Sequence, residues 1–98
     1  MIYKVIIVPL AVQDIKEINF FYKTLNKNLA ILFNNNLKNE IKIIKKNPFL
    51  FQLRYDDFRT VKVDKFPYLI HFEIHESSIV INAIYHTSRD SKIWLNRD

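Results

Sequence analysis

The sequence predicts a single α+β domain: an N-terminal strand, an antiparallel helical hairpin, then a mainly antiparallel sheet with a short C-terminal helix. Three observations predict this class. A β-branched segment opens the chain, two stretches of helical periodicity follow, and the remainder alternates apolar and polar residues between short polar turns. A chain of 98 residues, of which 49% are hydrophobic, supports one core. Residues 1–98 are therefore expected to form one domain.

The first strand is expected over residues 2–8, IYKVIIV, and Pro9 ends it. A helix over residues 11–26 follows, because apolar residues recur there at spacings of three and four. Its core face consists of Ala11, Ile15, Ile18, Tyr22 and Leu25. The second helix, over residues 28–46, has a core face of Leu29, Phe33, Leu37, Ile41 and Ile44. Asn47-Pro48 ends this helix, and the short break between the two helices predicts an antiparallel hairpin.

The remaining strands are recognised by their alternation. They are expected over residues 49–55, 59–63, 68–74 and 79–86, with polar turns between them. Asp90 is placed to cap a last helix in SKIWLNR, residues 91–97. Consecutive hairpins predict antiparallel pairing, with the helices on one face of the sheet and polar residues on the other.

The composition excludes several kinds of chemistry. The chain has no Gly, so it lacks the glycine loops of P-loop and dinucleotide sites and the glycine turn of a serine nucleophile. It has no Cys, which excludes disulfides and thiolate metal ligands and is compatible with a reducing cytoplasm. His71, Glu73 and His75 share a strand face, but this spacing is too wide for a compact metal site, and we expect them on a solvated polar face instead. No cofactor, metal or membrane-spanning helix is expected.

A set of basic residues is expected on or beside the sheet, where it would form a surface that binds the target or a nucleic acid. The formal net charge is +5, and the set comprises Arg54, Arg59, Lys62, Lys65, Arg89 and Arg97. His86 ends the last strand, where we expect it on the open face of the sheet. His86 could serve as acid or base, and two arginines could clamp the phosphate, if a ribose 2′-hydroxyl attacked its own phosphate. The alternative is that these are ordinary surface charges.

Apolar residues outside the core faces predict a covering partner. Phe20 on the first helix and Leu32 and Ile43 on the second point away from the expected core. The alternative is that the C-terminal helix, with Ile93, Trp94 and Leu95, folds back over them.

Taken in order, several segments resemble the RelE/ParE superfamily of bacterial toxins from type II toxin–antitoxin modules. They are residues 3–8 with Pro9 and Ala11, then DIKEINFFY, NPFLFQLRY, KFPYLIHFEI and AIYHTSRDSKIW, and they cover nearly the whole chain. The resemblance implies a cytoplasmic toxin whose cognate antitoxin wraps it. Operator DNA would be contacted only through that antitoxin. The resemblance assigns antitoxin binding to Phe20, Leu32, Ile43 and Trp94.

The superfamily divides by target. RelE-like members cleave messenger RNA on the ribosome, and ParE-like members poison DNA gyrase. Tyr68 stands where many of the ribonucleases have an arginine, and Thr87 follows His86 where several have a catalytic tyrosine. The resemblance is therefore nearer to the ParE side, and gyrase is the expected target. The alternative is a RelE-like ribonuclease in which His86 and Arg59 are catalytic.

Overall fold

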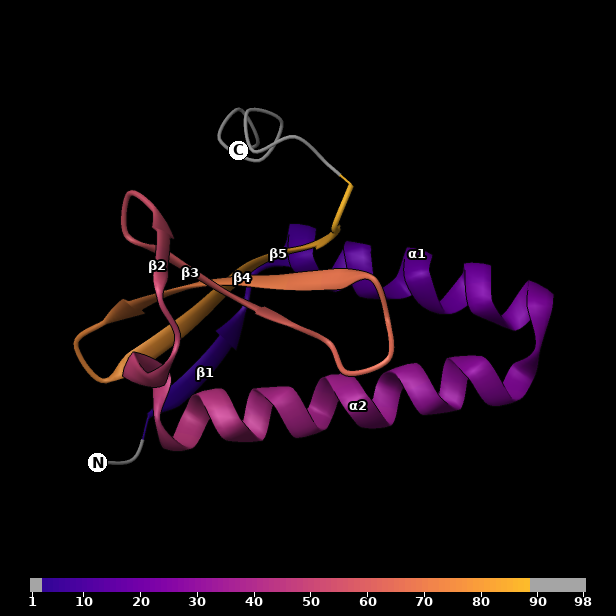
Figure 1. The fold of residues 1–98 in the computed structure, drawn as a ribbon, viewed down its shortest axis with the longest axis horizontal. Helices are drawn as coiled ribbons and strands as arrows, with labels where there is room; N and C mark the ends of the chain where they lie inside the picture. The colour runs from indigo at the N-terminus through magenta and orange to yellow at the C-terminus, as the bar shows by residue number, and fades with distance from the viewer. Residues whose placement is uncertain (1–2, 89–98) are drawn as a thin grey trace.

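Two antiparallel helices lie against one face of a five-stranded sheet (Figure 1). The computed structural model describes residues 3–88. The elements are β1 (Lys4–Ile7), α1 (Pro9–Leu25), α2 (Lys27–Lys46), the 3₁₀ turn η1 (Pro48–Leu50), β2 (Leu53–Tyr55), β3 (Phe58–Lys62), β4 (Tyr68–His75) and β5 (Ser78–His86). The predicted α+β class is confirmed; the predicted C-terminal helix over 91–97 lies outside the described residues.

The sheet has the strand order β1-β5-β4-β3-β2. Only the β1–β5 pair is parallel; the other three pairs are antiparallel. The chain therefore leaves the sheet after β1, forms the helical hairpin and the other strands, and returns to place β5 beside β1.

The helical hairpin is closed by a single residue. Asn26 is the C-cap of α1 and the N-cap of α2, and its side-chain oxygen accepts a hydrogen bond from the backbone N–H of Asn28 at 2.8 Å. α1 begins at Pro9, two residues earlier than expected, because proline is favoured in the first turn of a helix. The closed end of the hairpin extends beyond the sheet (Figure 1).

The main core lies between the helices and the sheet. Its fully buried side chains include Phe33 and Ile44 from α2 and Ile70, Phe72, Ile79 and Ile81 from the sheet. Phe33 meets the rings of Phe66 and Tyr68 edge to face, at centroid distances of 5.2 and 5.8 Å. Such ring pairs add to the stabilisation from buried area, so this end of the core is firmly packed.

A bulge in β5 changes which residues face the helices. His71 pairs with Ala83 and Phe72 pairs with Ile81, so Asn82 is an extra residue on β5. Before the bulge Ile81 faces the helices, and after it Ile84 does. His86, two residues further on, consequently shares the helix side of the sheet.

Two sequence-based assignments need correction. Residues 49–55 do not form one strand: Pro48–Leu50 is a 3₁₀ turn, and only Leu53–Tyr55 pairs with β3. The rigid φ of Pro48 suits the start of such a turn. Leu25 was placed on the core face of the first helix, yet its side chain is 61% exposed. The helical periodicity continues there beyond the edge of the sheet, where no strand covers it.

Candidate functional site

His86 lies at the helix-covered end of β5. It pairs across the strands with Tyr68, and the two rings meet edge to face at 5.4 Å between centroids. Directly paired residues point to the same face of a sheet, and Tyr68 packs against the core. The expectation that His86 would lie on the open face is therefore wrong, because the sequence alone does not reveal the bulge at Asn82.

The tautomer of the neutral His86 ring follows from its contacts. Its Nδ1 accepts a hydrogen bond from the backbone N–H of Ser88 at 3.1 Å and lies 2.8 Å from the Ser88 hydroxyl oxygen. An accepting Nδ1 places the proton of the neutral ring on Nε2. His86 thus has a fixed tautomer whose Nε2–H is available as a donor.

A shallow hollow lies between α1 and this end of the sheet. It is lined by Asp14, Glu17, Ile18, Phe21, Tyr68, Ile84, Tyr85 and His86. Asp14 ties the helix to β5, since its Oδ2 accepts a hydrogen bond from the Ile84 backbone N–H at 3.0 Å. Burial raises the pKa of Tyr68, and a hydrogen bond from Tyr22 opposes that rise. Tyr68 is therefore a neutral phenol and does not replace the cationic phosphate clamp of the ribonucleases.

Arg59 lies at the other end of the sheet. Its Nη1 donates to the Phe51 carbonyl oxygen at 2.6 Å, and its guanidinium carbon is 5.1 Å from the centre of the Phe49 ring. Arg59 on β3 pairs with Phe72 on β4, whereas His86 on β5 pairs with Tyr68 on β4. Phe72 and Tyr68 are four residues apart along β4. Four residues of strand span about 13 Å, so the structure does not bring Arg59 and His86 together.

The other predicted basic residues do not gather on one face. Arg59 lies against Phe49 and the Phe51 carbonyl, whereas Lys62 lines a separate hollow beside α2. Arg54 lies on the short strand β2, and Lys65 lies in the β3–β4 loop with a positive φ of 69°. Arg89 and Arg97 lie outside the described residues.

The face of the sheet away from the helices carries a small cluster of its own. His71 was expected to be solvated, but only 1% of it is exposed, and its Nδ1 lies 3.0 Å from the Tyr55 hydroxyl. Burial, followed by the nearby Tyr85, Asp56 and Glu73, raises the pKa of Tyr55 to about 12. Tyr55 therefore keeps its proton, and its hydroxyl is hydrogen-bonded to Nδ1 of His71.

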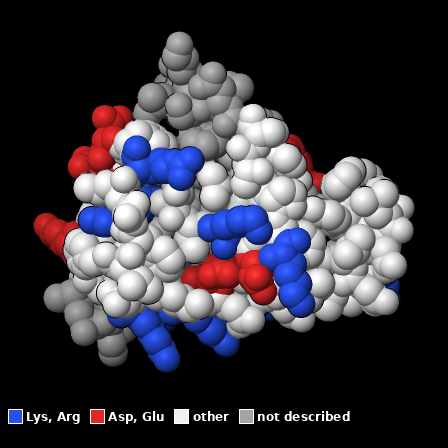
Figure 2. Space-filling model, viewed as in Figure 1, with Lys and Arg blue, Asp and Glu red and all other residues white. Residues whose placement is uncertain are grey.

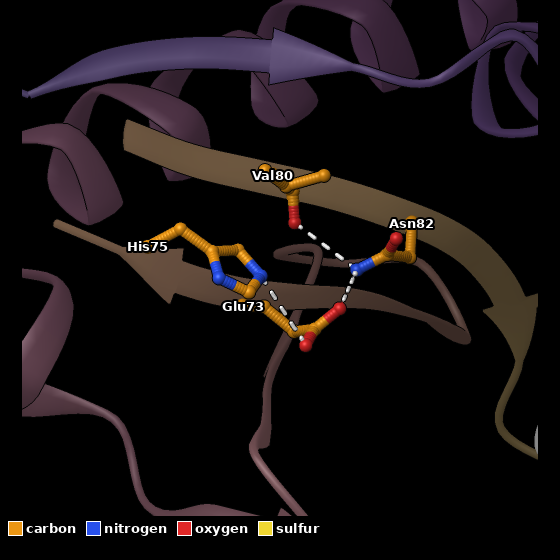
Figure 3. Close-up of polar contacts among 4 residues, drawn as sticks. All are labelled: Glu73, His75, Val80 and Asn82. Carbon is orange, nitrogen blue, oxygen red and sulfur yellow. Dashed lines mark hydrogen bonds and ion pairs between the residues drawn. The ribbon is translucent and has the colours of Figure 1, made fainter. Parts of the chain in front are cut away.

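A polar group continues this far face toward the β4–β5 turn (Figure 3). Asn82 donates to Glu73 at 3.0 Å, and the second Glu73 oxygen lies 3.4 Å from Nε2 of His75. Within residues 3–88, no group of three or more metal-ligating side chains is placed to hold an ion. In the same part of the chain, no helix has the length and apolar character that a membrane crossing requires.

Large apolar side chains are exposed at the closed end of the helical hairpin. Phe20, predicted from the sequence, is 71% exposed, and Leu32 is 37% exposed. Sequence reasoning missed three further exposed apolar side chains near this end, which are Phe21, Leu25 and Ile31. The signal was available in principle, since all five lie within seven residues of the hairpin turn. We call these five residues the hairpin-end patch.

The remaining predicted apolar residues lie elsewhere. Ile43 is 45% exposed near the other end of α2, beside Asn39 and Lys62. Trp94 lies outside the described residues. A second exposed group, formed by Phe49, Leu50 and Leu53, borders β2 and Arg59 and was not predicted. It results from the 3₁₀ turn, which the sequence reading had assigned to a strand.

Comparison with known proteins first defines the fold. A solved structure described as the chromosomal ParDE toxin–antitoxin system from P. aeruginosa is similar, with a TM-score of 0.77. The match has 16% sequence identity and covers 87% of this chain and 96% of that one. No curated protein sequence matches the chain. The chain thus shares the α+β fold of that structure.

The family follows from the sequence itself. Residues 5–91 match the family described as the ParE toxin of the type II toxin–antitoxin system parDE. The chain therefore belongs to the ParE toxin family. The resemblance to the ParE side of the superfamily is confirmed, and the family implies an antitoxin as partner.

Proposed function

We propose that the protein arrests bacterial growth by poisoning DNA gyrase, and that its antitoxin neutralises it by covering the hairpin-end patch. Membership of the ParE family supports the choice of target. Gyrase would be met in the cytoplasm. A gyrase poison needs surface shape and charge, and it needs no catalytic pair.

The separation of His86 from Arg59 is the observation that favours gyrase over messenger RNA. A ribonuclease needs an acid–base group and a cation on the same phosphate. Here the Arg59 guanidinium is hydrogen-bonded to the Phe51 carbonyl, and His86 lies about 13 Å further along the sheet. His86 alone, beside a neutral Tyr68, is a weak basis for phosphate cleavage.

A supercoiling assay with purified gyrase tests the target. Wild-type protein should inhibit supercoiling and accumulate cleaved plasmid, and His86→Ala should retain this activity because the residue acts on no substrate. A parallel cell-free translation reaction reads messenger RNA integrity by primer extension. Ribosome-dependent cuts that disappear in His86→Ala, with supercoiling unaffected, would establish the ribonuclease instead.

The hairpin-end patch has the character of a docking surface for the antitoxin. Five large apolar side chains are exposed on a part of the hairpin that extends beyond the sheet (Figure 1). Residues 18–37 contain two lysines, Lys23 and Lys27, and no Asp or Glu. An antitoxin segment with apolar side chains flanked by acidic ones would complement this surface.

Alanine substitution of Phe20 tests the docking surface. Because Phe20 is 71% exposed, its loss should leave folding intact, while affinity for the antitoxin falls about tenfold to a hundredfold, as for an interface hot spot. Leu50→Ala is the matched control, since Leu50 is 64% exposed on another surface. Equal losses for both variants in isothermal titration would refute the assignment to the hairpin-end patch.

A further inference from the structure

The positive charge of the described chain is concentrated on α2. Residues 3–88 contain twelve Lys and Arg and eight Asp and Glu, a formal charge of +4. α2 alone has five Lys and one Glu, which also gives +4. Outside α2, the described residues have seven basic and seven acidic side chains, so their charges cancel.

Four of these lysines form a stripe along the helix. Lys27, Lys38, Lys42 and Lys45 follow one another at spacings of eleven, four and three residues. At 100° per residue, they lie within about 60° of one another and about 110° from the buried face of α2. The stripe, which we call the α2 lysine stripe, is about 27 Å long. Lys and Arg side chains project along the edge of the molecule where α2 runs (Figure 2).

The fold itself makes no use of these charges. All four side chains are exposed, and within residues 3–88 none of them forms an ion pair. The single acidic residue of the helix, Glu40, lies on the opposite flank, where its carboxylate accepts the Asp64 backbone N–H at 3.2 Å. The stripe is therefore an uncompensated line of positive charge.

We infer that the α2 lysine stripe binds the phosphate backbone of duplex DNA without sequence preference. Lysine side chains bind phosphates as point charges, and phosphate contacts carry no sequence information. Only side chains that enter a groove of the DNA reach the base edges. The stripe has one exposed large apolar side chain, Ile31, at the end that it shares with the hairpin-end patch. The part from Lys38 to Lys45 has none, and protein interfaces are depleted in lysine, so a protein partner is the poorer fit there. A length of about 27 Å corresponds to roughly eight base pairs.

This inference goes beyond the proposed function and does not depend on it. The sequence had suggested a binding surface for the target or a nucleic acid, formed by Arg54, Lys62, Lys65, Arg89 and Arg97. The family resemblance had implied that operator DNA is contacted only through the antitoxin. The stripe instead gives the toxin a DNA contact of its own. In a gyrase complex, which holds DNA, that contact would add to binding of the enzyme.

Fluorescence anisotropy with a labelled 24-base-pair duplex, without gyrase or antitoxin, tests the inference. The variant with Lys38→Gln, Lys42→Gln and Lys45→Gln removes three charges and keeps good helix formers. Four contacts predict a slope of log K against log salt of about −3.6, and the variant should lower its magnitude by about 2.7. At 50 mM salt its affinity should fall tenfold or more.

Two charge-matched variants complete the experiment. One replaces Lys4, Lys16 and Lys23 with Gln, and the other replaces Arg54, Lys62 and Lys65; each should change affinity less than about threefold. The inference would be overturned if either of these variants lost as much affinity for the duplex as the stripe variant does. It would also be overturned if the wild type showed no salt-dependent binding. Stripe-dependent binding of phosphatidylserine vesicles without binding of the duplex would overturn it as well. Circular dichroism checks folding, and the supercoiling assay tests the proposed function separately.

Discussion

The two faces of the sheet are formed by the same strands but are stabilised by different interactions. On the helix side, Phe33, Phe72 and Ile81 are fully buried in one continuous apolar core. On the far side, no helix of the described chain covers the strands. The cluster there centres on the hydrogen bond between Tyr55 and His71. Buried area should therefore determine stability on one face, and individual polar contacts on the other.

The largest expected effect is on the helix side. Phe33→Ala should lower the free energy of unfolding by about 3–5 kcal/mol, because the substitution leaves a cavity among Phe66, Tyr68 and Tyr22. Urea denaturation followed by circular dichroism measures it. Phe21→Ala is the control: the side chain is 51% exposed, so the change should be below about 1 kcal/mol. Similar losses for both would contradict the described packing.

A smaller effect is expected from the far face. Tyr55→Phe keeps the ring and removes the hydroxyl that is hydrogen-bonded to Nδ1 of His71, which should lower the free energy of unfolding by about 1 kcal/mol. A loss comparable to that of Phe33→Ala would show that the two faces do not differ in the way described.

The same variant should change the response to alkali. The pKa of Tyr55 is about 12 in the folded protein against an ordinary 10.0, so the folded state retains the proton more firmly than the unfolded chain. This contribution to stability is fully present below pH 10 and is lost as the pH rises from 10 toward 12. Tyr55→Phe should reduce the loss of stability over that range, as denaturation midpoints at successive pH values would reveal. Identical pH profiles for the two proteins would contradict the raised pKa.

The contrast between the faces explains what the sequence could predict. On the helix side, the spacing of Phe33, Leu37 and Ile44 and the alternation of Ile70 and Phe72 are imposed by burial, so periodicity reveals them. The order of the elements and the hairpin followed from the same signal. On the far side, His71 is buried by residues from other strands. The sequence of its own strand does not indicate this burial, because a histidine at an alternating position is typical of a solvated face.

The errors at the candidate site have a similar origin. The bulge at Asn82 depends on pairing between β4 and β5, so the sequence of β5 alone does not place His86 on the helix side. Arg59 looked like a free cation because its partners, the Phe51 carbonyl and the Phe49 ring, belong to a turn mistaken for a strand. The spacing of the α2 lysines can be read from the sequence once the helix is predicted. The sequence reading did not separate their charge from the rest of the described chain, where basic and acidic side chains cancel.

The smallest expected effect belongs to the exposed end of the far face, where Glu73 lies between Asn82 and His75 (Figure 3). The His75 side chain is 59% exposed and its nitrogen is 3.4 Å from the carboxylate, so solvent and salt screen the pair. His75→Gln should change the free energy of unfolding by less than about 0.5 kcal/mol, with no dependence on salt above 0.5 M. Asn82→Ala removes the hydrogen bond that Asn82 donates to Glu73 and should lower the free energy of unfolding by about 1 kcal/mol. If His75→Gln proved the more damaging of the two in the same urea titration, charge rather than hydrogen bonding would be what stabilises this end of the face.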